Sequence, residues 1–173
     1  DMISKIVVPI AKDETGGTLF DKLAEAGAKL LVETLPHIFD GTAVYDKQPE
    51  ESPTPYAGMI TKQMGLINFG KSAEELERLV RGLNPWPSAF TFWNGKTLKV
   101  WESFVVKSEE AGTEKPEPGT VVKTDKKGIY VACGEDVLVL SQVQLEGKKR
   151  MDADAFLRGC HIETGSRFTD KKE

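Results

Sequence analysis

The sequence predicts an α+β chain with three parts: an incomplete α/β segment, a linker, and a small antiparallel β-barrel with short helices. Three observations lead to this prediction. An apolar run near the start is followed by apolar residues at helical spacing, and a Pro-rich stretch comes next. Five short strand patterns then fall within about 60 residues, a density that is typical of small barrels.

The N-terminal part of the chain predicts one strand and two helices. Residues 6–10 are mostly apolar and indicate a strand. Thr18 precedes an aspartate by three residues, the spacing of a capping box, so we expect a helix from there to Gly27. A second helix is expected over residues 28–39, and Gly41 ends it. So short a stretch cannot enclose its own core, and we interpret it as the trailing edge of an α/β domain.

Prolines among Glu, Ser and Thr residues mark residues 42–58 as an extended segment, and we expect the domain boundary there. The predicted division therefore has four parts. Residues 1–41 are the incomplete edge of an α/β domain, and residues 42–70 form a linker. Residues 71–168 form the barrel domain, and residues 169–173 are a charged, frayed tail.

The predicted barrel domain begins with a helix. Ser72 and Glu75 have capping-box spacing, an apolar stripe follows, and the two prolines within residues 84–87 end the helix. Asn94 and Gly95 then form a strong hairpin signal. A charged loop is expected over residues 107–118 and a short helix over residues 152–157. The strands are predicted at residues 89–93, 97–106, 120–124, 129–133 and 137–145.

Charge and hydropathy exclude several classes of protein. The net charge is −4 over 173 residues. Residues 1–84 carry 9 basic and 13 acidic side chains, whereas residues 85–173 carry 14 of each. Neither half has the strongly basic character of a dedicated nucleic-acid binder, so any RNA contact must use a local patch. No apolar run approaches the ~18 residues that a membrane span requires.

The sequence contains few residues that could carry chemistry. Its two cysteines, Cys133 and Cys160, and its two histidines, His37 and His161, have no metal-ligand spacing. Two cysteines cannot build a disulfide framework. We therefore expect both to be free thiols that behave as small apolar side chains, in a protein of the reducing cytoplasm. No nucleophile lies near a histidine or carboxylate in a catalytic pattern. We therefore predict no catalytic, cofactor-binding or metal-binding residue.

Three motifs each allow a binding interpretation and a structural one. Residues 15–18 (TGGT) could cradle an anion, but a simple helix N-terminus is favoured. Trp86 could stack on a nucleotide base, but a rigid corner that anchors the preceding helix is favoured. Residues 147–150 (GKKR) suit phosphate oxygens as well as a solvated loop, and the residues alone leave both interpretations open.

Several stretches, taken in order, resemble methionyl-tRNA formyltransferase and cover residue 1 to about residue 165. The most specific are RGLNPWP at residues 81–87 and LKVW at residues 98–101. Others are DETGGTLFDKL at residues 13–23, VACG at residues 131–134, GKKRM at residues 147–151 and FLRG at residues 156–159. The resemblance implies a Rossmann-like formyltransferase domain whose trailing edge begins this chain, then a linker and an OB-like C-terminal domain.

The resemblance also implies a reaction. The family transfers a formyl group from 10-formyltetrahydrofolate to the methionine amino group of initiator methionyl-tRNA. The family's catalytic residues and folate-binding loop match no part of this chain, because they belong to the N-terminal domain that precedes Asp1. We therefore expect this part to be inactive alone and to contribute tRNA binding without sequence specificity.

The same resemblance implies which residues contact RNA. Lys62 falls at a basic position of the linker, and Lys148 and Lys149 fall at the paired lysines after the last strand. Arg150 and Lys99 lie on the same predicted domain and complete the candidate set. One departure weakens the linker as a phosphate-binding arm, because residues 63–65 are QMG where family members often have further lysines.

Two alternatives remain open. The chain could be the C-terminal subdomain of another folate-dependent formyltransferase, such as one that acts on sugar nucleotides. It could also be a stand-alone OB-like nucleic-acid-binding module without an enzymatic parent. The incomplete α/β segment argues against the second alternative, because a stand-alone module has no use for it.

Overall fold

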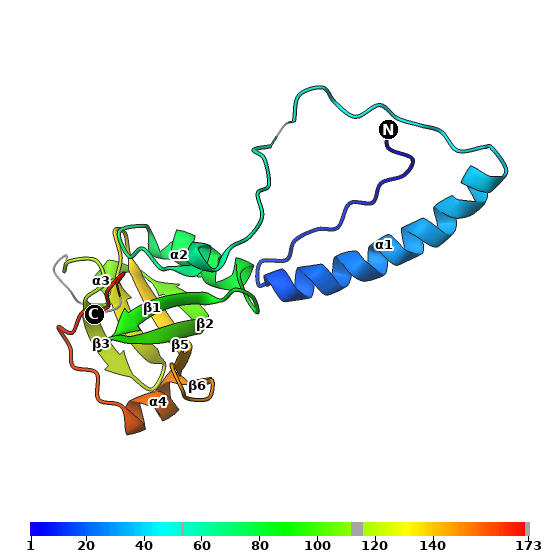
Figure 1. The fold of residues 1–173 in the computed structure, drawn as a ribbon. Coiled ribbons are helices and arrows are strands. Elements are labelled where there is room, and N and C mark those ends of the chain that lie inside the picture. Colours follow the sequence, from blue (N-terminus) through cyan, green and yellow to red (C-terminus); the bar gives the residue numbers. More distant parts are fainter. Residues whose placement is uncertain (53, 112–115, 172–173) are drawn as a thin grey trace. The chain divides into compact units, whose positions relative to one another are not determined.

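The computed structural model describes residues 1–52, 54–111 and 116–171. Contacts divide the chain into two units, Asp1–Met59 (unit 1) and Ile60–Glu173 (unit 2). Both are visible in Figure 1. The finer predicted division at residues 42, 71 and 169 stays a prediction.

Unit 1 contains one long helix, α1, over Gly16–Phe39 (Figure 1). Its N-cap is Thr15, whose hydroxyl accepts the Thr18 N–H while the Thr18 hydroxyl accepts the Thr15 N–H at 3.0 Å. The helix therefore begins one turn earlier than predicted, and the TGGT motif serves as a helix N-terminus. No residue of α1 is buried, which agrees with the expectation that this segment has no core of its own.

Two further predictions for unit 1 were wrong. Gly27 does not end the helix, because glycine within a helix costs only about 1 kcal/mol and the apolar pattern continues past it. Residues 6–10 are extended but form no strand, and Val7 is 89% exposed. A strand requires a neighbour that pairs with its backbone, and among described residues 1–10 the β-bridge at Met2, with Asp46, is the only one.

Unit 2 is built on one antiparallel sheet in the order β1-β2-β5-β4-β3, with β6 paired to β5. The short η1 helix precedes α2, whose Ser72–Glu75 capping box forms as predicted. A short helix, α3, lies within the predicted loop, of which residues 112–115 are outside the described part. The elements are η1 Lys62–Gly65, α2 Ala73–Gly82, β1 Ala89–Trp93, β2 Lys96–Val106, α3 Ser108–Ala111, β3 Val121–Asp125, β4 Gly128–Ala132, β5 Val137–Leu145, β6 Met151–Asp152 and α4 Ala153–Gly159.

The strand ladders of the described residues do not join β1 directly to β3, so they give an open six-stranded sheet where we predicted a barrel. The C-terminal segment lies against both of these outer strands. Thr169 exchanges two backbone hydrogen bonds with Phe92 of β1, at 3.0 and 3.1 Å. Gly165 and Ser166 bond to Val121 of β3, both at 2.8 Å. Thr169, the first residue of the predicted tail, is therefore paired, while residues 172–173 lie outside the described part.

The core of unit 2 lies between the sheet and its helices. In Figure 1, α2 and α4 lie above and below the strands. Leu76 and Val80 of α2 are buried against the sheet, and Phe156 of α4 is buried with its ring 6.5 Å from that of Trp93. All five residues of β4 are buried, so this strand is covered on both faces. Burial of these apolar side chains supplies the main stabilising free energy of unit 2.

No helix in the described ranges is long and apolar enough to cross a membrane.

A close backbone approach at Gly134 leads to the first prediction. The Gly134 N–H donates to the carbonyl oxygens of both Phe69 and Lys71, and an added Cβ would lie 2.1 Å from the Gly70 oxygen. We expect Gly134→Ala to lower the free energy of unfolding by about 1–3 kcal/mol, because the backbone at Gly70 or Gly134 must move to make room for the added Cβ. Denaturant unfolding followed by tryptophan fluorescence measures the change.

The matched control is Gly159→Ala in α4, where an added Cβ would meet nothing within 4 Å. This variant should change stability by less than about 1 kcal/mol. Equal stability of the two variants would contradict the proposed role of the Gly134 contact.

Candidate nucleic-acid interface

Lys99 lies on the outer face of the sheet where β2 pairs with β5. Its neighbours in sequence, Leu98 and Val100, are buried in the core, so the alternation of a strand turns Lys99 outward. Lys99 stands opposite Gln144 of β5 in the antiparallel register. The pairing thus brings a predicted RNA-contact residue next to the strand that leads into the GKKR motif.

A β-bulge interrupts this pairing and directs Trp101. Val100 pairs with Val143 and Glu102 pairs with Gln142, so Trp101 is an extra residue on β2. The Trp101 carbonyl accepts a hydrogen bond of 3.0 Å from the Asn84 side chain, which joins the corner after α2 to this strand. The bulge allows consecutive residues, Trp101 and Glu102, both to reach the same arginine on the outer face.

Trp101 is the centre of a cluster of polar and cationic groups. Its indole N–H donates to Oε1 of Gln144 at 3.1 Å. The guanidinium carbon of Arg150 lies 4.7 Å from the centre of the Trp101 ring, and Nζ of Lys99 lies 5.7 Å from it. Cations at these distances are attracted by the electron density of an indole face.

Arg150 is held by further contacts. Its Nη2 lies 3.0 Å from Oε1 of Glu102, and its Nε donates to Oε1 of Gln142. The guanidinium therefore joins β2 to β5 while it stacks on Trp101. The ion pair with Glu102 partly neutralises the charge of Arg150.

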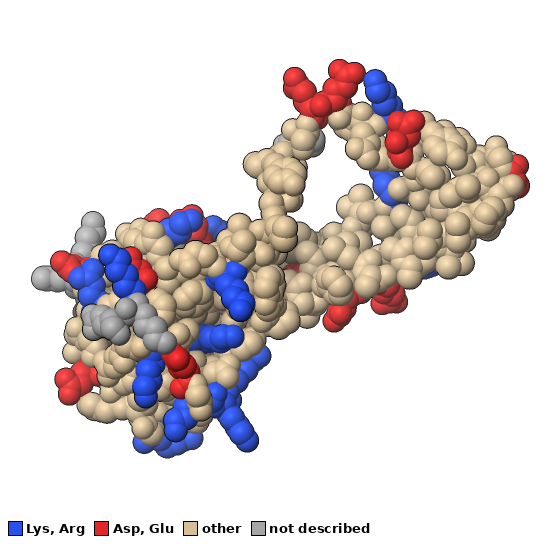
Figure 2. Space-filling model, viewed as in Figure 1, with Lys and Arg blue, Asp and Glu red and all other residues tan. Residues whose placement is uncertain are grey.

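Residues 147–150, here called the basic turn, follow β5. The Lys148 N–H donates to the Leu145 carbonyl at 2.8 Å, and the Lys148 carbonyl accepts from Nε2 of Gln144 at 2.9 Å. Gly147 has φ of 78°, a left-handed conformation that favours glycine. Lys148 and Lys149 are exposed, and no ion pair with another described residue engages either ammonium group. Figure 2 shows Lys and Arg side chains outnumbering acidic ones on the viewed face of unit 2.

Lys62 lies apart from this cluster. It is exposed at the start of η1, and the chain after η1 runs beside β1, where the Ile67 N–H donates to the Phe90 carbonyl at 2.8 Å. Phe90 in turn pairs with Lys99 across β1 and β2. The structure therefore gathers Lys99, the basic turn and Trp101 around β2 and β5, whereas Lys62 begins η1, which contacts β1.

Sequence reasoning did not include four residues of this cluster in the candidate site: Trp101, Glu102, Gln142 and Gln144. The sequence does carry a signal for Trp101. This residue lies two positions after Lys99 on a predicted strand, and residues two apart on a strand share one face. The partners of Trp101 on β5 depend on the register, which no local pattern specifies. The favoured role of Trp86 as an anchor for α2 was wrong, since Trp86 is 58% exposed and α2 packs through Leu76 and Val80.

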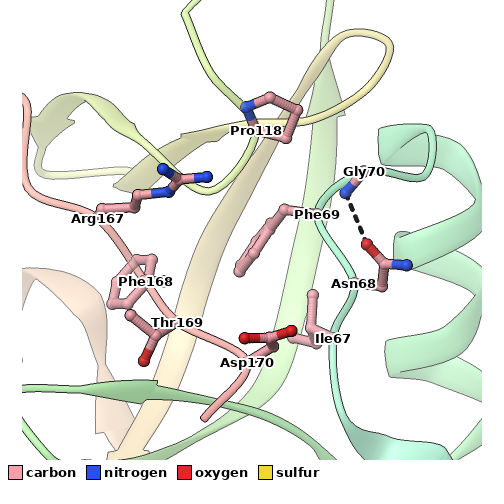
Figure 3. Close-up of a pocket in the computed structure, with 9 residues that line it drawn as sticks. All are labelled: Ile67, Asn68, Phe69, Gly70, Pro118, Arg167, Phe168, Thr169 and Asp170. Atoms are coloured by element: carbon pink, nitrogen blue, oxygen red, sulfur yellow. Dashed lines mark hydrogen bonds between the residues drawn. The ribbon is translucent and has the colours of Figure 1, made fainter. Parts of the chain in front are cut away.

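A separate pocket of about 460 Å³ lies between residues 67–70 and residues 167–170 (Figure 3). Phe69 and Phe168 are stacked there with ring centres 6.1 Å apart, and Oδ1 of Asn68 accepts the Gly70 N–H at 2.9 Å. Arg167 points toward this opening and is ion-paired with Glu117 at 2.6 Å. None of the predicted RNA-contact residues lines the pocket, so it is distinct from the candidate interface.

The groups capable of nucleophilic or metal chemistry are unfavourably placed. Burial raises the pKa of the Cys133 thiol to about 12 and also raises the pKa of Cys160, so both remain protonated at neutral pH. Within the described ranges, no group of three or more His, Cys, Asp or Glu residues could hold a metal ion. The cluster around Trp101 combines cations and amides with the Glu102 carboxylate, and the groups beside it that suit binding to an anion are the exposed Lys148 and Lys149.

Comparison with known proteins identifies the family. A family model described as formyl transferase, C-terminal domain, matches residues 59–161, which include η1, the sheet and the basic turn. The chain belongs to the formyl transferase family. The resemblance predicted from the sequence is confirmed, because the chain corresponds to the C-terminal part of methionyl-tRNA formyltransferases.

Curated formyl transferase relatives match nearly the whole chain. The methionyl-tRNA formyltransferase of Agathobacter rectalis is 54% identical over 169 residues, which are 98% of this chain and 53% of that protein. The methionyl-tRNA formyltransferase of Bacillus subtilis is 47% identical over 166 residues, 95% of this chain and 51% of that protein. The chain therefore spans about half the length of the curated relatives that it matches.

Solved structures with a similar fold belong to a more distant protein. A variant of HypX from Aquifex aeolicus has a TM-score of 0.57 at 10% identity and covers 85% of this chain and 26% of that one. HypX in complex with tetrahydrofolic acid has a TM-score of 0.50 at 12% identity, covering 75% of this chain and 22% of that one. At such low identity the likeness concerns the fold alone.

The unequal contacts of neighbouring basic residues lead to the second prediction. We expect Arg150→Ala to lower the free energy of unfolding by about 1 kcal/mol, because it removes a cation–π contact and an ion pair. Lys149→Ala, the matched control, should change stability by less than about 0.5 kcal/mol. Thermal and denaturant unfolding measure both, and an equal loss in the two variants would contradict this reading of the contacts.

Proposed function

We propose that this chain is the tRNA-contacting part of a methionyl-tRNA formyltransferase. The whole protein would transfer a formyl group from 10-formyltetrahydrofolate to the methionine amino group of initiator methionyl-tRNA. The support is the high identity to curated proteins of that name over nearly the entire chain. With initiator tRNA as the partner, the cytoplasm is the proposed compartment, and the sheet with its C-terminal segment is the proposed OB-like domain.

The observation that carries the proposed RNA contact is the pair of exposed lysines in the basic turn. Lys148 and Lys149 extend from a turn whose backbone is held on β5, and neither ammonium is paired with another described residue. We assign Lys99, beside the basic turn, and Arg150, within it, as supporting positions, and Lys62 on η1 as a separate one. A few cations of this kind would bind RNA phosphates without reading sequence, and the affinity would fall as salt rises.

The chain's net charge of −4 is consistent with this assignment. A uniformly basic surface would attract any polyanion. A local basic patch adds affinity only for RNA that already lies against it. We propose that the basic turn contributes backbone contacts of this limited kind. Discrimination of the initiator tRNA is assigned to other parts of the whole protein.

Formyl transfer needs a general base and groups that stabilise the charge of a tetrahedral intermediate. The resemblance to the family assigns these groups to its N-terminal domain, and burial raises the pKa of the Cys133 thiol, which makes it a poor nucleophile. We therefore propose that catalysis and 10-formyltetrahydrofolate binding belong to the remainder of the whole protein.

An alternative is the C-terminal subdomain of a different folate-dependent formyltransferase. The observation that favours it is the matching family model, which is described as formyl transferase, C-terminal domain, and names no formyl acceptor. RNA binding discriminates between the two proposals, because a subdomain from an enzyme that acts on small molecules has no need to bind tRNA phosphates.

The third prediction concerns salt-dependent RNA binding. We expect this chain to bind initiator tRNA weakly, with an affinity that falls as salt increases. The double variant Lys148→Ala/Lys149→Ala should reduce the slope of log affinity against log salt by roughly one to two, since each lost phosphate contact contributes about 0.9. Fluorescence anisotropy with labelled tRNA across a salt series measures both quantities.

A matched control is Lys126→Ala/Lys127→Ala, which removes another adjacent pair of lysines from the turn between β3 and β4. That turn also contains Asp125, whose carboxylate lies 2.8 Å from Nζ of Lys123 and accepts the Lys127 N–H. We expect this control to keep the slope of the unmodified chain. Equal reductions in both double variants would reject a specific role for the basic turn.

The fourth prediction concerns activity. We expect the purified chain to transfer no formyl group from 10-formyltetrahydrofolate to methionyl-tRNA above a protein-free control. The physical reason is that the base and the charge-stabilising groups that the reaction needs are assigned to the remainder of the whole protein. Turnover measured with radiolabelled methionyl-tRNA would contradict the assignment of catalysis to the remainder of the whole protein.

A further inference from the structure

The basic turn is held against the sheet at two places, and Trp101 takes part in both. At one place, Oε1 of Gln144 accepts the indole N–H of Trp101 at 3.1 Å while Nε2 of Gln144 donates to the Lys148 carbonyl at 2.9 Å. At the other, the Arg150 guanidinium stacks 4.7 Å from the centre of the Trp101 ring. Lys149 lies between these two points of attachment.

The chemistry of the first attachment fixes the orientation of the Gln144 amide. An indole N–H can only donate a hydrogen bond, and a backbone carbonyl can only accept one. The amide oxygen must therefore face Trp101, and the amide nitrogen must face Lys148. An inverted amide would lose both bonds, so Gln144 has a single orientation that satisfies its two partners.

The second attachment holds the Arg150 side chain through contacts with β2 and β5. Glu102 and Gln142 hold the guanidinium from β2 and β5, and the bulge at Trp101 lets Glu102 and the indole reach the same arginine. None of these contacts uses the ammonium group of Lys148 or Lys149. The contacts thus order the backbone of the turn and leave its two lysine charges available.

We infer that Trp101 and Gln144 are positioning residues that hold the basic turn for phosphate binding, and that Arg150 acts mainly as part of this support. The inference rests on the proposed RNA-binding function and deepens it. A turn that is ordered before binding loses less conformational freedom when its lysines meet phosphates. Trp101 and Gln144 would therefore strengthen RNA binding without adding a phosphate contact of their own.

The first experiment uses the RNA-free chain and the variant Gln144→Met, which keeps the length of the side chain and removes both hydrogen bonds. Amide hydrogen exchange at Lys148, whose N–H donates to the Leu145 carbonyl, should become about fivefold faster, the equilibrium effect of losing roughly one intramolecular hydrogen bond. Exchange at Val100 and Val143, in the ladder beside the bulge, should keep its rate. The matched control is Gln48→Met in unit 1, where Gln48 is exposed.

The second experiment measures tRNA binding across a salt series. Gln144→Met should weaken binding about fivefold at fixed salt, and its salt slope should equal that of the unmodified chain because no cation is removed. Lys149→Ala should reduce the slope by about one. Trp101→Phe, which keeps an aromatic face for Arg150 and loses the indole N–H, should behave like Gln144→Met.

The outcomes separate this inference from the proposed function. Unchanged exchange at the Lys148 amide in Gln144→Met would overturn the positioning role, whatever the RNA result. Faster exchange together with unaltered RNA affinity would overturn it too. Failure of the unmodified chain to bind tRNA at low salt would instead reject the proposed function, while the exchange data would still decide whether Gln144 orders the turn.

Discussion

The antiparallel pairing of β2 with β5 is the interaction on which the rest of unit 2 depends. It joins the two longest strands, and their inward side chains, among them Leu98, Val100 and Leu140, are fully buried. β1 attaches to one side of this pair and β4 to the other, so the order of the sheet follows from it. The same register fixes which residues meet on the outer face, where the candidate interface lies.

The bulge in this pairing connects stability to the proposed function. A regular strand would turn Trp101 and Glu102 to opposite faces, whereas the extra residue lets both contact Arg150. The Asn84 side chain satisfies the Trp101 carbonyl at the irregularity, which links the end of α2 to the interface. A local departure from regular pairing thus creates the surface on which the basic turn rests.

The two units illustrate different requirements for stability. Unit 2 encloses a large apolar core and a smaller second cluster, and its C-terminal segment bonds to both outer strands of the sheet. Unit 1 consists of a long helix and extended segments, and α1 has no buried residue. A helix with exposed Phe20, Leu31 and Phe39 is typical of one that packs against further apolar surface. The contrast agrees with the family membership, in which the matched domain begins at residue 59.

The sequence by itself determined the elements whose signals are local, and it determined the family. The Ser72 capping box, the Asn94–Gly95 hairpin and the apolar pattern of β5 each specify their structure within a few residues, and all three are found. The pairing of Thr169, the open order of the sheet and the partners of Arg150 were decided only by tertiary structure. Tertiary structure also decided that residues 6–10 form no strand, because a strand exists only where another segment pairs with its backbone. The sequence marked GKKR as basic, but the register of β2 with β5 decided that Arg150 is ion-paired, whereas Lys148 and Lys149 form no ion pair with another described residue.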